Sequence, residues 1–267
     1  MDSTYWHRQL AGKPLYPDLL WSRPQNKVTA GKLIIIGGNA HGFAAPAEAY
    51  SVATTTGIGT ARVVLPDAIK HIAGKLLDGL SYAASTPSGS FSQQAYGEIM
   101  EHVLWSDGVL VCGDLGRNSQ TAIVIEKILT TYQGQVTLAK DAADYGVNLA
   151  KLVCDRPQTL LVLTIAQLQK LFQAMGWPKP ITFSMDLLQL IDQLHEFTSQ
   201  HPVTILVKHL EVFVVAVEGQ VTTSPAPADP EELWRVKTAA QAATWWLQNA
   251  QQPLAALTTS LVQDWQV

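Results

Sequence analysis

Short apolar runs alternate with longer amphipathic segments along most of this chain. The first run, Lys32–Ile36, is followed by Gly37 and Gly38 and then by an Ala-rich segment over 44–56. A short run of β-branched residues that ends in glycines is typical of a strand buried on both faces. The Ala-rich segment predicts a helix, and Gly57 supplies the residue type that commonly ends one.

The same alternation of strand-like and helix-like segments continues to the end of the chain. Pro66 predicts the start of a helix, and Thr164 predicts the cap of another. A long helix is expected over 183–198, where one face holds Met185, Leu188, Ile191, Leu194 and His195. The other predicted strands cover 61–65, 80–83, 108–112, 135–139, 159–163, 203–207, 212–217 and 221–223, and the other predicted helices cover 96–105, 120–132, 165–175, 231–249 and 254–265.

A strand followed by a helix, repeated several times, predicts parallel strands with helices on both faces. The last two predicted strands form a hairpin about 218–220. We therefore expect an α/β fold: a three-layer αβα domain with a mostly parallel central sheet and a late β-hairpin. No linker or change of composition divides the chain, so we expect a single domain over residues 1–267, in which residues 1–31 form an N-terminal arm. Trp6 and Trp21 are expected to anchor this arm to the body or to a partner subunit.

Composition and charge narrow the range of partners. The chain has 267 residues, 47% hydrophobic and 15% charged, with a formal net charge of −4. It contains no basic block, so nucleic acid and anionic membranes are not expected partners. It has neither a signal-peptide core nor an apolar run of bilayer-spanning length, which predicts a cytoplasmic protein. Cys112 and Cys154 lack metal-site spacing, so we expect isolated thiols in a reducing compartment and no metal ligands.

Common nucleotide-binding and hydrolase motifs are absent from the sequence. The glycines after the first strand spell GGxxxG and not the GxGxxG of dinucleotide-binding folds. Neither a Walker A motif nor a GxSxG elbow occurs. His41 lies beside the glycine turn, where a lone histidine is more often a loop residue than a catalytic base.

Polar residues instead follow several of the predicted strands. Gly37-Gly38 follows the first strand, Leu115-Gly116-Arg117 and Asp141 follow two middle strands, and Lys208 ends a late one. The carboxyl ends of parallel strands share one edge of the sheet, where open α/β folds bind ligands. The Lys208 ammonium and the backbone N–H groups of the glycine turns would suit a phosphate. The alternative is that Lys208 only extends its charged end to solvent.

Several of these segments resemble one known family in residue type and in order along the chain. The segment 24–39 is similar to its opening strand and glycine turn, and Thr56–Gly59 is similar to its Thr-Gly-Ala-Gly. Cys112–Arg117, CGDLGR, stands where the family has Gly-Pro-Gly-Leu-Gly-Arg. Asp141 falls on the second aspartate of its Asp-Ala-Asp, and Lys208 on the lysine of its Leu-Lys-Gly. Over most of its length the chain thus resembles the ATP- or ADP-dependent NAD(P)H-hydrate dehydratases, carbohydrate kinase-like lyases of the ribokinase-like superfamily.

This resemblance implies a ribokinase-like fold and a set of site residues. Nucleotide phosphates would contact Lys208, and the substrate would contact Gly37, Gly38, Asn39, Ala45, Gly116 and Asp141. The implied cofactors are ATP or ADP with Mg²⁺, and the implied substrate is hydrated NADH or NADPH, a small-molecule dinucleotide. A homo-oligomer is implied as well, and the aromatic residues that its contacts would bury are Trp6, Trp234, Trp245 and Trp246. The alternative for Trp245 and Trp246 is that they divide between core and surface.

The chain departs from the family pattern at three places. The family's Thr-Pro-His-Pro-Gly-Glu survives only as Thr164, the glycine after its lysine is His209, and its Gly-x-Gly-Asp is absent. The family's Gly-x-Gly-Asp, which forms an anion hole at a helix N-terminus and supplies the catalytic aspartate, falls here on Trp234-Arg235-Val236-Lys237. Side chains in place of the glycines would fill the hole, and Lys237 in place of the aspartate removes the carboxylate. No catalytic residue is therefore assigned. A hydrate dehydratase with lost or altered catalysis and a non-catalytic nucleotide-binding or scaffolding pseudoenzyme both stay open, and the lost aspartate disfavours a kinase for another substrate.

Overall fold

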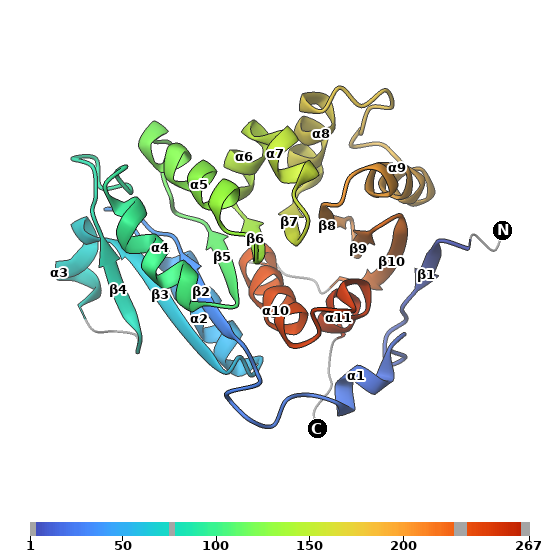
Figure 1. The fold of residues 1–267 in the computed structure, drawn as a ribbon. Helices are drawn as coiled ribbons and strands as arrows, with labels where there is room; N and C mark the ends of the chain where they lie inside the picture. Colours follow the sequence, from blue (N-terminus) through green and yellow to red (C-terminus); the bar gives the residue numbers. More distant parts are fainter. Residues whose placement is uncertain (1–3, 75–77, 227–233, 263–267) are drawn as a thin grey trace.

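One sheet of ten strands runs through the part of the chain that the computed structural model describes, residues 4–74, 78–226 and 234–262 (Figure 1). The strands lie in the order β1-β10-β9-β8-β7-β6-β5-β2-β3-β4. β9 runs antiparallel to β8 and β10, and all other neighbours are parallel. The predicted α/β fold with a mostly parallel sheet and a late hairpin is confirmed. The strands are β1 (Trp6–Arg8), β2 (Lys32–Ile36), β3 (Thr60–Pro66), β4 (Leu80–Ala83), β5 (Gly108–Cys112), β6 (Gln135–Ala139), β7 (Thr159–Leu163), β8 (Thr204–His209), β9 (Val212–Val217) and β10 (Gln220–Pro225).

Helices cover both faces of this sheet and complete the three layers. α4 to α9 pack on one face, while α2, α3, α10 and α11 pack on the other (Figure 1). Side chains alternate in direction along a strand, so Ile34 and Ile36 enter the first core while Leu33 and Ile35 enter the second. The helices are α1 (Pro17–Trp21), α2 (Ala44–Thr55), α3 (Lys70–Ala73), α4 (Ala95–Trp105), α5 (Ser119–Thr131), α6 (Asp141–Asn148), α7 (Ala150–Asp155), α8 (Ile165–Ala174), α9 (Leu187–Gln200), α10 (Trp234–Gln248) and α11 (Pro253–Ser260).

The direction in which strands are added reverses between β2 and β5, in the middle of the sheet. From β2 the chain adds β3 and β4 on one side, then returns to place β5 on the other side and continues through β6, β7 and β8. α2 after β2 and α5 after β5 accordingly lie on opposite faces. The loops after these two strands therefore diverge at this edge, which is where open α/β sheets bind ligands.

The N-terminal arm contributes a strand that the sequence does not predict. β1 pairs in parallel with β10, and the Trp6 indole donates a hydrogen bond from Nε1 to Thr223 Oγ1 at 3.1 Å. Trp21 is 72% exposed and is therefore not buried against the body of this chain. Leu19 of α1 is buried instead, in a small cluster with Trp245 and alanines of α11. The strand β1, with Trp6, and the buried Leu19 hold the arm against the body.

The tryptophans of α10 are core residues. Trp245 and Trp246 are both buried, in separate hydrophobic clusters. The expected division between core and surface is therefore wrong, and so is the expectation that these two indoles are surface residues that a subunit contact would bury. The side chain of Trp234 lies outside the described residues, as do 231–233 and 263–265 of the predicted C-terminal helices. No helix in the described ranges is long and apolar enough to cross a membrane.

The ends of several elements differ from the prediction for local reasons. Pro66 closes β3 and precedes a 3₁₀ turn, where a helix start was expected. α9 begins later than predicted, because the Asp186 side chain caps it by accepting the Gln189 N–H at 2.8 Å. Leu188, predicted on the buried face of this helix, is 57% exposed. α6 and α7 lie between predicted elements and were not expected from the sequence.

Candidate ligand-binding crevice

The carboxyl ends of β2, β5 and β6 meet at the point where the strand order reverses. The Gly38 N–H after β2 donates to the Gly113 carbonyl after β5 at 3.3 Å. A Cβ atom on Gly37 would lie 2.2 Å from the Cys112 carbonyl oxygen, so only glycine fits there. Because these glycines have no side chains, the loop after β2 and the loop after β5 are in direct contact.

The backbone N–H groups of the turn after β2 already have hydrogen-bond acceptors within the protein. Those of Gly37, Asn39 and Ala40 donate to backbone carbonyls at 3.3, 3.0 and 2.9 Å. The Asn39 carboxamide oxygen also accepts the N–H of His41 at 2.7 Å, and His41 is an exposed loop residue, as expected. A phosphate would reach these N–H groups only by breaking the existing bonds. This turn therefore does not provide the phosphate cradle expected from its glycines.

An ion pair held by further hydrogen bonds lies at this edge of the sheet. Lys140, directly after β6, places Nζ 2.7 Å from Oδ1 of Asp114, which follows β5. The other oxygen of Asp114 accepts the Ala45 N–H, in the first turn of α2, at 3.0 Å. The Lys140 carbonyl in turn accepts a hydrogen bond from the Gln167 side chain of α8 at 3.0 Å. Two strand ends and two helices thus fix this pair.

The backbone at both members of the pair is unusual. Asp114 has φ 58°, and Lys140 has φ 57° and ψ −130°, a combination that favours glycine. A Cβ atom on Gly113 would lie 2.4 Å from Lys140 Cδ, so this glycine leaves room for the lysine side chain to cross to Asp114. Lys140 stands at a sharp strand-to-helix turn in a strained conformation. Asp114, in the neighbouring loop, has a positive φ that aspartate adopts more readily than most residues.

Asp141, the first residue of α6, holds the loop after β5. Its Oδ2 accepts the Leu115 N–H at 2.7 Å, while its Oδ1 is buried and has no hydrogen-bond partner among the described residues. The Tyr145 hydroxyl, one turn later, donates to the Gly116 carbonyl and accepts the Asn118 N–H at 3.1 Å. Burial raises the pKa of Tyr145, so the hydroxyl stays protonated as this arrangement requires.

A cavity of about 560 Å³ opens beside this edge, between the start of α5, α6 and one residue of α8. Gly116 and Asp141, two of the predicted substrate contacts, both line it. The other lining residues that carry charge are Arg117, Glu126, Asp144 and Lys170. The predicted contacts Gly37, Gly38 and Asn39 lie on the loop after β2, and Ala45 lies in the first turn of α2, so the predicted substrate contacts share one edge of the sheet.

Lys208, the predicted nucleotide contact, and Lys237, at the position of the family's aspartate, do not line this cavity. Lys208 is half-buried on β8, two strands away from β6, and strand alternation places it on the α10 face together with Leu206. Lys237 lies in the first turn of α10, with Nζ 3.9 Å from Oε1 of Glu48 on α2. The position assigned to the family's aspartate therefore carries a lysine that faces an acid.

Both cysteines are buried thiols. Burial, reinforced by the charges of Asp114 and Asp141, raises the pKa of Cys112 well above its usual range. Burial and the nearby Asp155 raise the pKa of Cys154 to about 12. A thiol acts as a nucleophile only as the thiolate, so neither group is a candidate for covalent catalysis. Among the described residues no group of three His, Cys, Asp or Glu is arranged to hold a metal ion.

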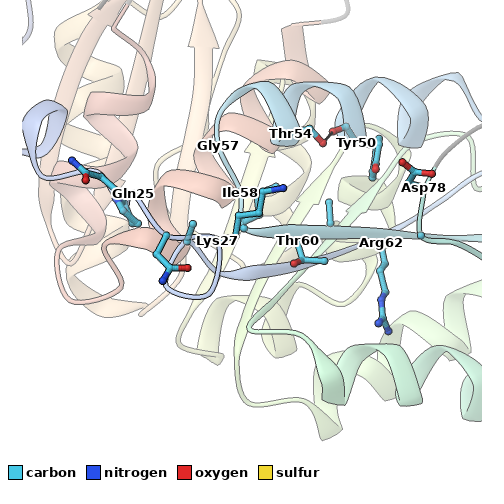
Figure 2. Close-up of a pocket in the computed structure, with 15 residues that line it drawn as sticks. Gln25, Lys27, Tyr50, Thr54, Gly57, Ile58, Thr60, Arg62 and Asp78 are labelled. Carbon is cyan, nitrogen blue, oxygen red and sulfur yellow. Dashed lines mark hydrogen bonds between the residues drawn. The ribbon is translucent and has the colours of Figure 1, made fainter.

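A second cavity lies at the opposite edge of the sheet, where β3 begins and α2 ends (Figure 2). It has a volume of about 620 Å³, and its lining includes Tyr50, Gly57, Ile58 and Asp78. Arg62 extends to the other side of β3 in Figure 2, and its guanidinium carbon lies 3.7 Å from the ring centroid of Trp105. None of the predicted site residues lines this cavity.

Sequence reasoning missed the central pair of the crevice. Asp114 appears in the CGDLGR segment, but as a departure from the family motif, and Lys140 was not singled out. Charged residues directly after two buried strands were the available signal. The sequence pattern does not show that β5 and β6 are neighbours in the sheet. The contact between the two side chains cannot be predicted without knowing that these strands pair.

No family model matches this chain, and neither does any curated protein. Solved structures are similar to it. A ribokinase-like superfamily protein of Enterococcus faecalis V583 has a TM-score of 0.74 and 14% identity, covering 98% of this chain and 88% of that one. A hypothetical protein of Streptococcus mutans has a TM-score of 0.66 and 15% identity, covering 89% of this chain and 82% of that one.

A third similar structure is the ADP/ATP-dependent NAD(P)H-hydrate dehydratase of Bacillus subtilis co-crystallised with ATP and Mg²⁺. Its TM-score is 0.59 with 14% identity, covering 88% of this chain and 79% of that one. At such identities the comparisons show the fold alone. The chain has the ribokinase-like fold, as its resemblance to that superfamily implied, and its fold neighbours include an NAD(P)H-hydrate dehydratase and a phosphomethylpyrimidine kinase.

Proposed function

We propose that this protein is a nucleotide-dependent dehydratase of hydrated NADH or NADPH whose catalysis follows an altered route. The observation that carries the proposal is the convergence of Gly38, Asp114, Gly116 and Asp141 at the switch point, beside a cavity of about 560 Å³. A cavity of that volume is in the usual range for small-molecule sites. The fold neighbour co-crystallised with ATP and Mg²⁺ supports a nucleotide as the second ligand.

The residues at the crevice would support Mg²⁺ only as part of a nucleotide complex. Mg²⁺ keeps several waters and is commonly held by one or two carboxylates together with substrate phosphates. Asp114 and Asp141 each have at least one carboxylate oxygen engaged by the protein, and the described residues form no cage for a metal ion. The ion would neutralise phosphate charge when bound, and the protein would contribute at most a carboxylate oxygen to it.

A second function is favoured by one observation at α10. Lys237, at the position of the family's catalytic aspartate, is paired with Glu48. If no other group replaces the missing carboxylate, the chain would bind a nucleotide without turning it over, as a pseudoenzyme of the same fold. The two candidate functions share nucleotide binding and differ in turnover.

Two measurements on the purified protein separate these functions. With ATP or ADP and hydrated NADH, a dehydratase restores absorbance at the wavelength of NADH, and a pseudoenzyme gives no recovery above a no-enzyme control. A thermal shift with ATP and ADP tests binding itself, because a ligand that binds only the native state raises the melting temperature. A flat response to both nucleotides would contradict either function.

Lys208→Ala tests the placement of the nucleotide. The ammonium would lie at the phosphates, so the variant should lose most of the thermal shift given by ADP. Lys151→Ala, an exposed lysine of α7, is the matched control and should keep the full shift. An unchanged shift in Lys208→Ala would place the phosphates elsewhere.

A further inference from the structure

We propose that Asp114 is the carboxylate that takes the proton of the substrate hydroxyl, and that Lys140 is the residue that positions it. This inference rests on the proposed dehydratase function and assigns the group that makes its route different. The family motifs have glycine and alanine at the positions of Asp114 and Lys140, so the resemblance assigns no role to these two residues.

The surroundings of Asp114 suit a proton acceptor. Lys140 Nζ lies 2.7 Å from Oδ1, and the Ala45 N–H donates to Oδ2 at 3.0 Å. A carboxylate has about four lone-pair directions, so two donors leave positions for a third. The Asp114 side chain is 23% exposed, so part of the carboxylate is open to a substrate hydroxyl. It lies outside the cavity lining itself, two residues before Gly116, which lines the cavity. The ammonium holds the carboxylate in one orientation.

The other carboxylate at this edge is less suitable. Asp141 Oδ2 accepts the Leu115 N–H at 2.7 Å, and its Oδ1 is buried away from the crevice surface. A proton transferred to Oδ2 would oppose the hydrogen bond that holds the loop after β5. Asp141 is therefore assigned to holding this loop, and Asp114 to the proton.

The backbone supports a functional role for the pair. Asp114 and Lys140 are non-glycine residues with φ 58° and 57°, they follow neighbouring strands, and their side chains touch. Strained conformations of this kind persist where surrounding structure enforces them and are concentrated at functional sites. A glycine at either position would relax the backbone. The conformational cost at Lys140 exceeds what a partly exposed ion pair contributes to stability.

The placement also accounts for the missing motif. Asp114 accepts the N–H of Ala45, and Lys237 faces Glu48 one turn further along α2. The carboxylate of Asp114 and the lysine at the position of the family's aspartate are thus held by the same end of one helix. The family has its carboxylate at the start of α10, whereas this chain has a lysine there and a carboxylate just after β5.

The proposed step balances as a phosphoryl transfer from ATP. The O–H bond of the substrate hydroxyl breaks and its proton goes to Asp114, while the oxygen forms a bond to the terminal phosphorus. The bond from that phosphorus to the bridging oxygen breaks, and ADP leaves with the electron pair. In the following step the ring C–O bond breaks, phosphate leaves with its electron pair, and loss of a ring proton to solvent restores the double bond of NADH.

The experiment compares Asp114→Asn and Lys140→Met with the wild-type protein. The readouts are kcat and KM for ATP-dependent recovery of NADH, and the thermal shift with ADP. Asp114→Asn should lower kcat by about 10²- to 10⁴-fold and keep the ADP shift, since a general base contributes that much. Lys140→Met should lower kcat with little change in KM or in the ADP shift, because the carboxylate loses the donor that orients it, and Lys140→Arg should restore part of kcat by supplying a donor. Asp18→Asn, on α1 and exposed, is the control.

A further variant guards against loss of folding. Asp114→Gly suits φ 58°, so it should fold, and added formate should restore part of its rate by supplying a carboxylate. Retention of kcat within about threefold in Asp114→Asn, or no rescue by formate, would overturn the assignment. A wild-type protein that binds ADP but never restores NADH would also overturn it and leave the pseudoenzyme. A wild-type protein without any nucleotide shift would instead refute the proposed function, and the assignment with it.

Discussion

At the scale of single residues, the crevice is defined by backbone conformations that side chains rarely adopt. Lys140 combines φ 57° with ψ −130°, yet it carries a long side chain. Such strain costs about 1–3 kcal/mol, whereas a partly exposed ion pair contributes about 0.2–1 kcal/mol. The Lys140–Asp114 pair is 35% and 23% exposed, so its attraction does not offset the strain.

Lys140→Gly should therefore stabilise the protein while removing the charge. The gain should be about 1 kcal/mol after allowing for the greater freedom of glycine in the unfolded chain. Urea unfolding measures it, and Lys151→Gly in α7 is the matched control, which should cost about 1 kcal/mol. Equal losses in the two variants would show that residue 140 stores no strain.

At the scale of elements, the buried guanidinium of Arg156 joins three elements at the edge of the sheet opposite the crevice. Arg156, at the end of α7, donates from Nε to the Leu129 carbonyl at 3.0 Å and from Nη2 to the Tyr132 carbonyl at 2.5 Å. It also donates from Nη1 to Thr159 Oγ1, at the start of β7, at 2.9 Å. Burial lowers the pKa of Arg156, and hydrogen bonds to these acceptors compensate for the buried charge. The end of α5 and the loops into β6 and β7 depend on this contact.

Arg156→Met should destabilise the protein by about 2–4 kcal/mol, since it leaves several buried carbonyl groups without donors. Methionine keeps the aliphatic part of the arginine side chain, so the decrease in unfolding free energy measures the contribution of the guanidinium. Arg117→Met is the control at an exposed arginine, and its unfolding free energy should stay within about 0.5 kcal/mol of wild type. A similar small change in both variants would mean that water replaces the guanidinium in satisfying those carbonyls.

At the scale of the whole molecule, two hydrophobic cores share one sheet, and each contains a buried thiol. Cys154 lies in the core under α4 to α9, and Cys112 lies in the core under α2 and α10. Burial raises both pKa values, that of Cys154 from 9.0 to about 12. The unfolded chain loses these protons near pH 9, and the folded protein does not. The contribution of the two buried thiols to the free energy of unfolding is therefore fully present below pH 9 and is lost as the pH rises toward 12.

The unfolding free energy should fall between pH 8 and pH 10.5, and Cys154→Ala should reduce the slope of that fall. Urea denaturation at several pH values measures this, and at pH 8 neither thiol of the native protein should react with a thiol reagent. The comparison of slopes removes the contribution of tyrosines, which titrate in the same range. An identical slope in the variant would show that Cys154 is accessible to water.

The sequence by itself determined the elements whose signals are local. β5 and β6 begin and end at the predicted residues, because a run of buried apolar residues closed by polar or glycine positions needs no knowledge of distant contacts. The same locality placed Gly37, Gly116 and Asp141 at strand ends, and parallel strands bring such ends to one edge. α6 escaped prediction because tertiary packing, more than periodicity, supports its small residues.

Only the tertiary structure decided which strand ends are neighbours. Asp114 and Lys140 are 26 residues apart, and they meet because β5 and β6 pair in register. The pairing of β1 with β10 and of Lys237 with Glu48 likewise joins the two ends of the chain to distant segments. Strand order depends on how all layers pack together, which no local pattern encodes. The chemistry proposed for the crevice rests on a contact of this kind.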